Sequence, residues 1–98
     1  MTKEVHIIRE VLSLCREITG EEGEQYRIRY ALMEERCGRQ PMYGIACCME
    51  GLAPMAHRCS RLPAWLESRA LGEALLEYLA EQAVTPPQLE DVLQEMLP

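Results

Sequence analysis

The side chains best suited to metal binding or catalysis in this 98-residue chain are those of a histidine and three cysteines. His57 and Cys59 are two positions apart, and Cys47 and Cys48 are consecutive and lie a short distance upstream. Imidazole nitrogens and thiolates are the ligands that Zn²⁺ prefers, and a thiolate beside an imidazole can also act as a nucleophile. These residues therefore suggest two kinds of site: a metal- or thiol-dependent sensor, and a Cys–His enzyme.

The spacing of these residues matches a zinc site only in part. Zinc sites usually show C-x₂₋₄-C or H-x₃₋₅-H spacing, and adjacent residues of a strand point to opposite faces, so only one of Cys47 and Cys48 can join the other two. A fourth ligand would have to come from Cys37, Cys15 or His6. We predict no cofactor, and we name His57, Cys59 and Cys47 as the metal-ligand candidates. A buried cysteine that packs as a small apolar side chain is the simpler interpretation.

The sequence offers less support for catalysis. No Asp or Asn is placed to orient His57, and the paired acids at 21–22, 34–35 and 90–91 lie beside turns or on the outside of a predicted helix, where carboxylates are solvated. The six glycines are scattered, and none precedes a helix with the spacing of a nucleotide-binding loop. We therefore name no catalytic residue and predict a non-enzymatic protein.

A β-hairpin over residues 25–49 must position these cysteines. Tyr26, Ile28, Tyr30 and Leu32 alternate with more polar residues, and apolar side chains alternate again after the breaker at residues 37–41. Folding about that breaker places both apolar rows on one face, and two independent patterns then set the register. The predicted pairs are Leu32 with Tyr43, Tyr30 with Ile45, Ile28 with Cys47, and Tyr26 with Met49.

The segments around the hairpin are less clearly patterned. Residues 3–18 carry apolar residues at helical spacing, but several of them are β-branched. We predict a short strand over residues 12–18 that pairs with residues 25–31, and we leave residues 1–11 as a flexible or helical segment. Residues 55–60 are predicted to form the next strand, which gives a meander of three or four strands.

Two helices are predicted in the C-terminal third. Ser68 is a suitable N-cap for the first, which runs to about residue 83 with Leu71, Leu75, Tyr78 and Leu79 as its apolar stripe. Thr85-Pro86-Pro87-Gln88 forms a capping box for the second, whose stripe is Leu89, Val92, Leu93, Met96 and Leu97. The predicted fold is α+β: one domain over residues 1–98, an antiparallel three- to four-stranded meander with two C-terminal helices packed on one face.

Composition limits the partners and the compartment. A net charge of −6 repels phosphate backbones, so nucleic-acid binding is disfavoured even though Arg27 and Arg29 share one strand face. No run approaches the roughly 20 apolar residues of a membrane span, and the first residues lack the order of a signal peptide. We expect a cytoplasmic protein that does not enter a membrane, and we expect its five cysteines to be reduced.

Parts of the chain resemble a known family. The run from Tyr26 to Glu35, the Tyr43-Gly44-Ile45 segment and the Thr85-Pro86-x-x-Leu89-x-Asp91-Val92 helix start are similar to short clostridial and Firmicutes proteins, a domain of unknown function. The similarity covers residues 24–97. It departs at residues 66–68, where Leu-Glu-Ser stands in place of an Asp-Ile-Ser-like cap. The resemblance implies a bacterial cytosolic protein with the strand–strand–helix–helix order, and it supplies no catalytic residue.

The sequence thus predicts a fold but does not assign a function. The leading hypothesis is a small interaction or regulatory module, either homodimeric or bound to an unknown protein partner, because an open sheet leaves an edge that must be blocked or paired. The alternative is a Cys/His metal- or thiol-dependent sensor.

Overall fold

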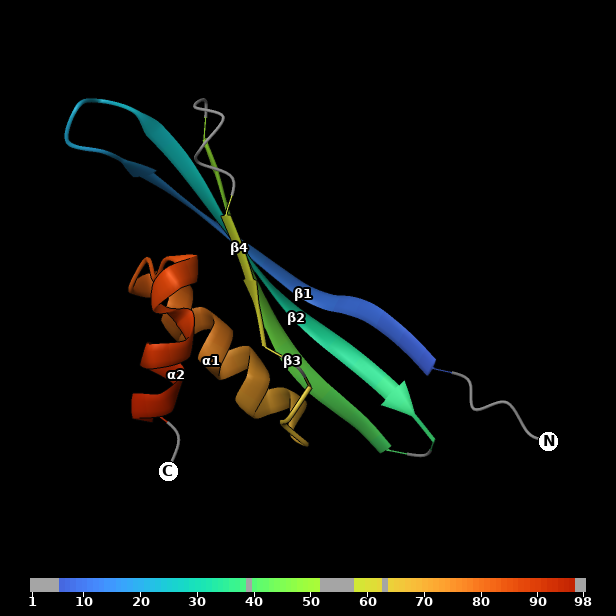
Figure 1. Ribbon diagram of the computed structural model, residues 1–98. Coiled ribbons are helices and arrows are strands. Elements are labelled where there is room, and N and C mark those ends of the chain that lie inside the picture. The colour runs from blue at the N-terminus through green and yellow to red at the C-terminus, as the bar shows by residue number, and fades with distance from the viewer. Residues whose placement is uncertain (1–5, 39, 52–57, 63, 97–98) are drawn as a thin grey trace.

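A computed structural model of the chain describes residues 6–38, 40–51, 58–62 and 64–96. In chain order the elements are β1 (His6–Thr19), β2 (Gln25–Cys37), β3 (Gln40–Gly51), β4 (Arg58–Arg61), α1 (Arg69–Glu81), a 3-10 turn η2 (Pro86–Gln88) and α2 (Leu89–Met96). The strands form one antiparallel sheet in the order β1-β2-β3-β4, and both helices lie on the same side of it (Figure 1). The predicted α+β meander is confirmed.

The central hairpin is present, but its predicted register is wrong by two residues. Leu32 lies opposite Ile45 rather than Tyr43, because Cys37 pairs directly with Gln40 and the loop is much shorter than the predicted breaker. Gly38 provides the positive φ of 81° that so tight a turn requires. A shift of two residues leaves every side chain on its predicted face, since the side-chain period of a strand is two.

β1 is longer than the sequence predicts. Residues 6–11, left open between a flexible and a helical segment, belong to the strand, which pairs with β2 from His6 to Thr19. The register shifts between Glu10 and Leu12, so Val11 is the extra residue of a β-bulge. This extra residue interrupts the alternation of the strand, which is why the apolar residues of β1 do not follow a strict period of two. Residues 1–5 lie outside the described part of the chain.

β4 is a short edge strand. It pairs with β3 over four residues, from Ala46 opposite Arg61 to Met49 opposite Arg58. After β4 the chain continues along β3, where Leu62 N donates to Ile45 O at 2.9 Å and Tyr43 exchanges two backbone hydrogen bonds with Leu66. The predicted strand over residues 55–60 is present from residue 58 onward, and residues 52–57 lie outside the described residues.

Helix α1 begins where the sequence predicts, but it buries a different stripe. Leu71 N donates to Ser68 Oγ at 3.2 Å, so Ser68 is the N-cap. The buried residues of the helix are Gly72, Leu75, Leu76 and Leu79, whereas Leu71 and Tyr78 are 44% and 39% exposed. Gly72 sets this rotation, because a Cβ atom there would lie 2.8 Å from Leu32 Cδ1 and the bare backbone permits close contact with β2.

The connection between the helices is hydrogen-bonded to the sheet through one backbone carbonyl, that of Val84. Tyr30 Oη donates to Val84 O at 2.7 Å, and the Cys47 thiol contacts the same oxygen at 3.7 Å. Gln88 Oε1 accepts from Thr85 N at 3.2 Å, as the predicted capping box requires. Val84 then packs in a core built from one face of the sheet and both helices: Ile28, Tyr30, Leu32, Tyr43, Ile45, Cys47, Leu66, Leu75, Leu76, Leu79, Leu89 and Leu93.

The helices are short. Within the described residues, neither helix has the length and the apolar character needed to cross a membrane.

Candidate functional site

The sheet has two faces with different surroundings. The covered face carries the core side chains of β2 and β3 and contacts the helices. The outer face is formed by the alternate residues, and both helices lie on the opposite side of the sheet (Figure 1). The outer-face residues are Glu10, Ser13, Cys15, Glu17, Arg27, Arg29, Ala31, Met33, Gly44, Ala46, Cys48, Glu50, Cys59 and Arg61.

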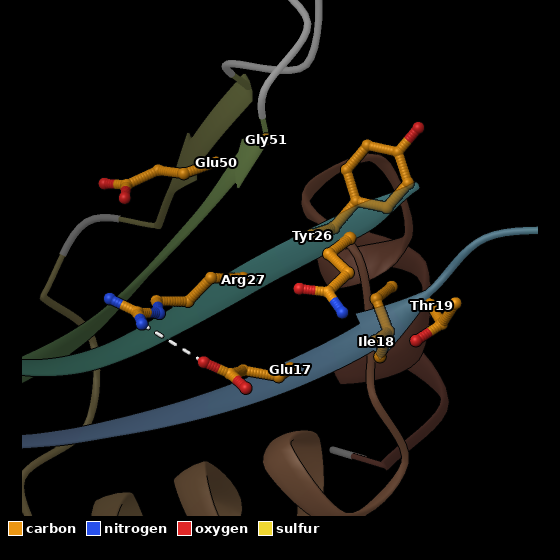
Figure 2. Close-up of a pocket in the computed structure, with 8 residues that line it drawn as sticks. Glu17, Ile18, Thr19, Tyr26, Arg27, Glu50 and Gly51 are labelled. Carbon is orange, nitrogen blue, oxygen red and sulfur yellow. Dashed lines mark hydrogen bonds and ion pairs between the residues drawn. The ribbon is translucent and has the colours of Figure 1, made fainter. Parts of the chain in front are cut away.

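Charged residues dominate one end of the outer face. Arg27 Nη2 lies 3.1 Å from Glu17 Oε1, and Figure 2 shows this contact crossing from β2 to β1, with Glu50 on the other side of Arg27. The hydrogen bond to Glu17 and the charge of that carboxylate raise the pKa of Arg27. These side chains border an open hollow of about 560 Å³, which is also lined by Ile18, Thr19, Gln25, Tyr26 and Gly51.

The charges at this end neutralise one another. Arg29 forms an ion pair with Glu10 and donates from Nε to Ser13 Oγ at 3.2 Å. Both arginines that the sequence places on this face therefore have acidic partners from β1.

Two of the five cysteines are joined on the outer face. Cys48 of β3 and Cys59 of β4 occupy directly opposed positions, with Cα atoms 4.1 Å apart, and form a disulfide. The prediction that the cysteines are reduced is wrong for this pair. Cys15 is a free, exposed thiol in the same cross-strand row, separated from Cys48 by Arg29.

The structure does not bring the predicted metal ligands together. Cys47 is buried on the covered face, whereas Cys59 is on the outer face, so they cannot share one ion. The cysteine that faces Cys59 is Cys48, because neighbouring residues of β3 alternate between faces. His57 lies outside the described residues, and the described part of the chain holds no group of three potential ligands.

Cys47 behaves as the simpler interpretation predicts. Its side chain is fully buried in the core, and burial raises the pKa of its thiol to about 11. A thiol with so high a pKa carries almost no thiolate at neutral pH, so Cys47 is a packing residue.

Glu34 is a buried carboxylate that the sequence analysis missed. It was interpreted as a solvated charge beside a turn, yet it is only 7% exposed on the covered face. Burial alone would raise its pKa, but hydrogen bonds from Arg9 Nε at 3.0 Å and Tyr43 Oη at 3.2 Å, together with the Arg9 charge, lower it overall. Its even-numbered position on β2, in phase with Ile28 and Leu32, is the signal that could have located it.

The free edge of β1 is the remaining surface feature. β1 is an outermost strand of the sheet and has β2 as its single neighbour in the described structure. Ile7 and Ile8 at its start are 50% and 44% exposed. After the bulge, residues 12–19 run without a further irregularity.

Comparison with protein-family models identifies the chain as a member of a family of unknown function, DUF6514, whose model matches residues 9–98. The chain belongs to this family, and the resemblance to a domain of unknown function is confirmed. Comparison with curated proteins and with solved structures gives no match.

Proposed function

We propose that the protein is a small, non-enzymatic interaction module that pairs with a second copy of itself through the free edge of β1, and that it acts in the cytosol. The observation that supports this proposal is the length of the edge, because β1 has 14 residues and, among the described residues, pairs on one side only. Such an edge presents a row of backbone N–H and C=O groups to another extended chain. A second copy offers the same row, so one two-fold axis satisfies both edges.

The side chains along β1 are suited to such pairing. Leu12, Leu14 and Ile18 pack against the core but remain half-buried, because no strand lies beyond them in the described sheet. A neighbouring strand would cover the surface they leave exposed, and burial of apolar surface contributes about 25 cal/mol per Å².

The charges of β1 select one antiparallel register. Centring the two-fold axis on Cys15 opposes no like charges. Val11 is the extra residue of the bulge and is left out of the pairing. An axis centred one residue earlier, on Leu14, would then place Glu10 opposite Glu17 of the second copy. An axis centred two residues earlier, on Ser13, would place Arg9 opposite Arg16 of the second copy. Centring it one or two residues later would place Arg16 or Glu17 opposite itself. Like charges directly opposed across strands are destabilising, so these registers are disfavoured.

The register centred on Cys15 also uses the regular part of both strands. It involves residues 12–19 of each copy and lies beyond the bulge. Each copy then pairs Leu12 with Ile18, Ser13 with Glu17, and Leu14 with Arg16 of the other. The covered faces of the two sheets become continuous, and both outer faces stay free.

Oxidative cross-linking tests this arrangement directly, because Cys15 is an exposed free thiol that meets its own copy in the proposed register. Mild oxidation should give a covalent dimer on a non-reducing gel, and Cys15→Ser should abolish it while light scattering still reports a dimer. A strict monomer by light scattering at high micromolar concentration would exclude self-association. A dimer without the Cys15 cross-link would exclude the proposed register.

Two substitutions of opposite charge at Ser13 test the register independently. Ser13 is exposed on the outer face and would lie opposite Glu17 of the second copy. Ser13→Glu should weaken the dimer and Ser13→Lys should strengthen it, each by about 0.2–1 kcal/mol for each of the two symmetric contacts, or roughly 2- to 30-fold in Kd. Equal dissociation constants for the two variants, measured by sedimentation, would contradict this register.

A further inference from the structure

We infer that Cys48 and Cys59 form a reversible thiol–disulfide site on the outer face, one that exchanges with low-molecular-weight thiols and presents a ready-made dithiol when reduced. The inference rests on the arrangement of β3 and β4 and does not depend on self-association.

The backbone, and not only the disulfide, holds the two sulfur atoms together. Cys48 and Cys59 are a directly opposed pair within the β3–β4 ladder, and antiparallel pairing by itself places opposed Cα atoms within about 4.5–5.5 Å of each other. Beyond β4, the hydrogen bond from Leu62 to Ile45 and the two between Tyr43 and Leu66 continue to anchor the chain on β3. Reduction should therefore leave β4 in register and the two thiols side by side.

The two sulfur atoms differ in accessibility. Cys59 is exposed, whereas Cys48 is half-buried between neighbouring strands of the sheet. An incoming thiolate therefore attacks the sulfur of Cys59, forms a mixed disulfide there and releases Cys48 as the thiolate. A second thiolate then attacks the sulfur of the external thiol in the mixed disulfide, which releases Cys59 as a thiolate and the external thiol as its own disulfide.

Charged residues of both signs surround the pair. Arg29 lies opposite Cys48 on β2, and Arg61 is two positions from Cys59 on the same face of β4. Glu50 is two positions from Cys48 on β3, and Arg29 is itself paired with Glu10. A cation beside a cysteine favours the thiolate, which is its reactive form, but Glu10 and Glu50 offset Arg29 and Arg61 here, so accessibility rather than charge directs the exchange.

Two other cysteines, Cys47 and Cys15, provide internal controls. Cys47 is buried on the covered face and is unavailable to an external thiol. Cys15 is exposed, but two strand spacings separate it from Cys48, about 9–10 Å between Cα atoms, which is too far for a disulfide without backbone movement. An intramolecular disulfide that forms and breaks should therefore involve Cys48 and Cys59, whereas the exposed Cys15 can form a mixed disulfide or an intermolecular cross-link.

Equilibration of the folded protein in glutathione buffers tests the site. After alkylation and peptide mass mapping, Cys48 and Cys59 should gain or lose both labels together as the ratio of reduced to oxidised glutathione changes, with the same midpoint from either direction. A pair that stays oxidised in excess reduced glutathione, or stays reduced in excess oxidised glutathione, would overturn the inference.

Phenylarsine oxide, which bridges two adjacent thiols, tests the reduced form. The reduced protein should bind one equivalent, Cys59→Ser should lose binding at least tenfold, and Cys15→Ser should bind like the parent. Far-UV circular dichroism accompanies each measurement. Loss of the sheet signal on reduction would show that the dithiol is not held in place and would refute the preorganised site, whereas a folded Cys59→Ser variant that still binds would assign the arsenical to other thiols.

Discussion

The two faces of the sheet are formed by the same strands, but the side chains on each face have different surroundings and roles. On the covered face, alternate residues of β2 and β3 are fully buried beneath the helices. On the outer face, their immediate neighbours are arginines, small residues and a disulfide that neither of the two described helices covers. Consecutive cysteines show the difference most clearly, because Cys47 is a buried packing residue and Cys48 is joined to β4 on the opposite side. Face, rather than residue type, decides the role of each side chain.

Truncating neighbours on β2 should give the largest contrast between the faces. Leu32 is fully buried on the covered face, so Leu32→Ala should lower the free energy of unfolding by about 2–5 kcal/mol. Met33 is half-buried on the outer face, and Met33→Ala should cost less than about 1 kcal/mol. Urea unfolding followed by circular dichroism measures both values. Equal losses would mean that the outer face is packed against something as firmly as the core.

A second test examines the close contact between α1 and β2. Gly72→Ala would gain helix propensity of up to about 1 kcal/mol, but its new Cβ would press on Leu32 in the core, where overpacking costs about 1–3 kcal/mol. We expect a net loss of about 1 kcal/mol from Gly72→Ala in the parent, and a gain in the Leu32→Ala background, where the space is free. Additive effects of the two changes in a double-mutant cycle would show that they do not meet.

How far the sequence could predict this fold depended on the kind of information each pattern carries. Alternation of Tyr26, Ile28, Tyr30 and Leu32 assigns a face to every residue, and those assignments are confirmed at Ile28, Tyr30 and Leu32, which are fully buried. Alternation cannot set the register, which depends on the length of the turn. Pro41 was interpreted as part of a breaker, but it is tolerated within β3 because β4 reaches only residues 46–49 and the start of β3 lacks that neighbour.

For the helices too, the sequence predicted the local feature, the start of each helix, but not the face of α1 that is buried. Capping residues located their starts, because Ser68 and Thr85 act locally on the first backbone N–H groups. The stripe of α1 was misassigned because Leu71, Leu75, Tyr78 and Leu79 recur at helical spacing, yet the helix turns Gly72 and Leu76 toward the sheet. That rotation depends on the shape of the opposing β2 surface, which no local pattern contains.

The candidate site was predicted least well, because it depends on pairing between distant segments. The sequence analysis allowed either Cys47 or Cys48 beside Cys59 and named Cys47 as the candidate, whereas the β3–β4 register places Cys48 there. The disulfide was missed for a different reason, since an odd number of cysteines without secretory context predicts reduced thiols. Glu34 was missed because its partners come from β1 and β3, through Arg9 and Tyr43.

The smallest expected difference is in the stability contributed by two ion pairs, each of which joins β1 to β2. In the outer pair, Arg27 and Glu17 side chains are 59% and 75% exposed, and exposed pairs contribute little to stability. In the covered pair, the Glu34 side chain is 8% exposed beside Arg9, and its pKa is lowered in the folded protein. A lowered folded-state pKa gives stability that is present above the unfolded pKa, about 4.3, and is lost as the pH falls through the folded pKa.

Glu34→Gln should therefore be less stable than the parent at pH 7, and the gap in urea midpoint should close as the pH falls below about 4. Glu17→Gln serves as the matched control, because it removes a carboxylate from the exposed pair on the same two strands. Its urea midpoint should follow the parent across the same pH range. If Glu34→Gln kept a constant difference at every pH, its effect would come from altered packing rather than from the carboxylate charge; if Glu17→Gln lost as much stability, exposure would not distinguish the two faces.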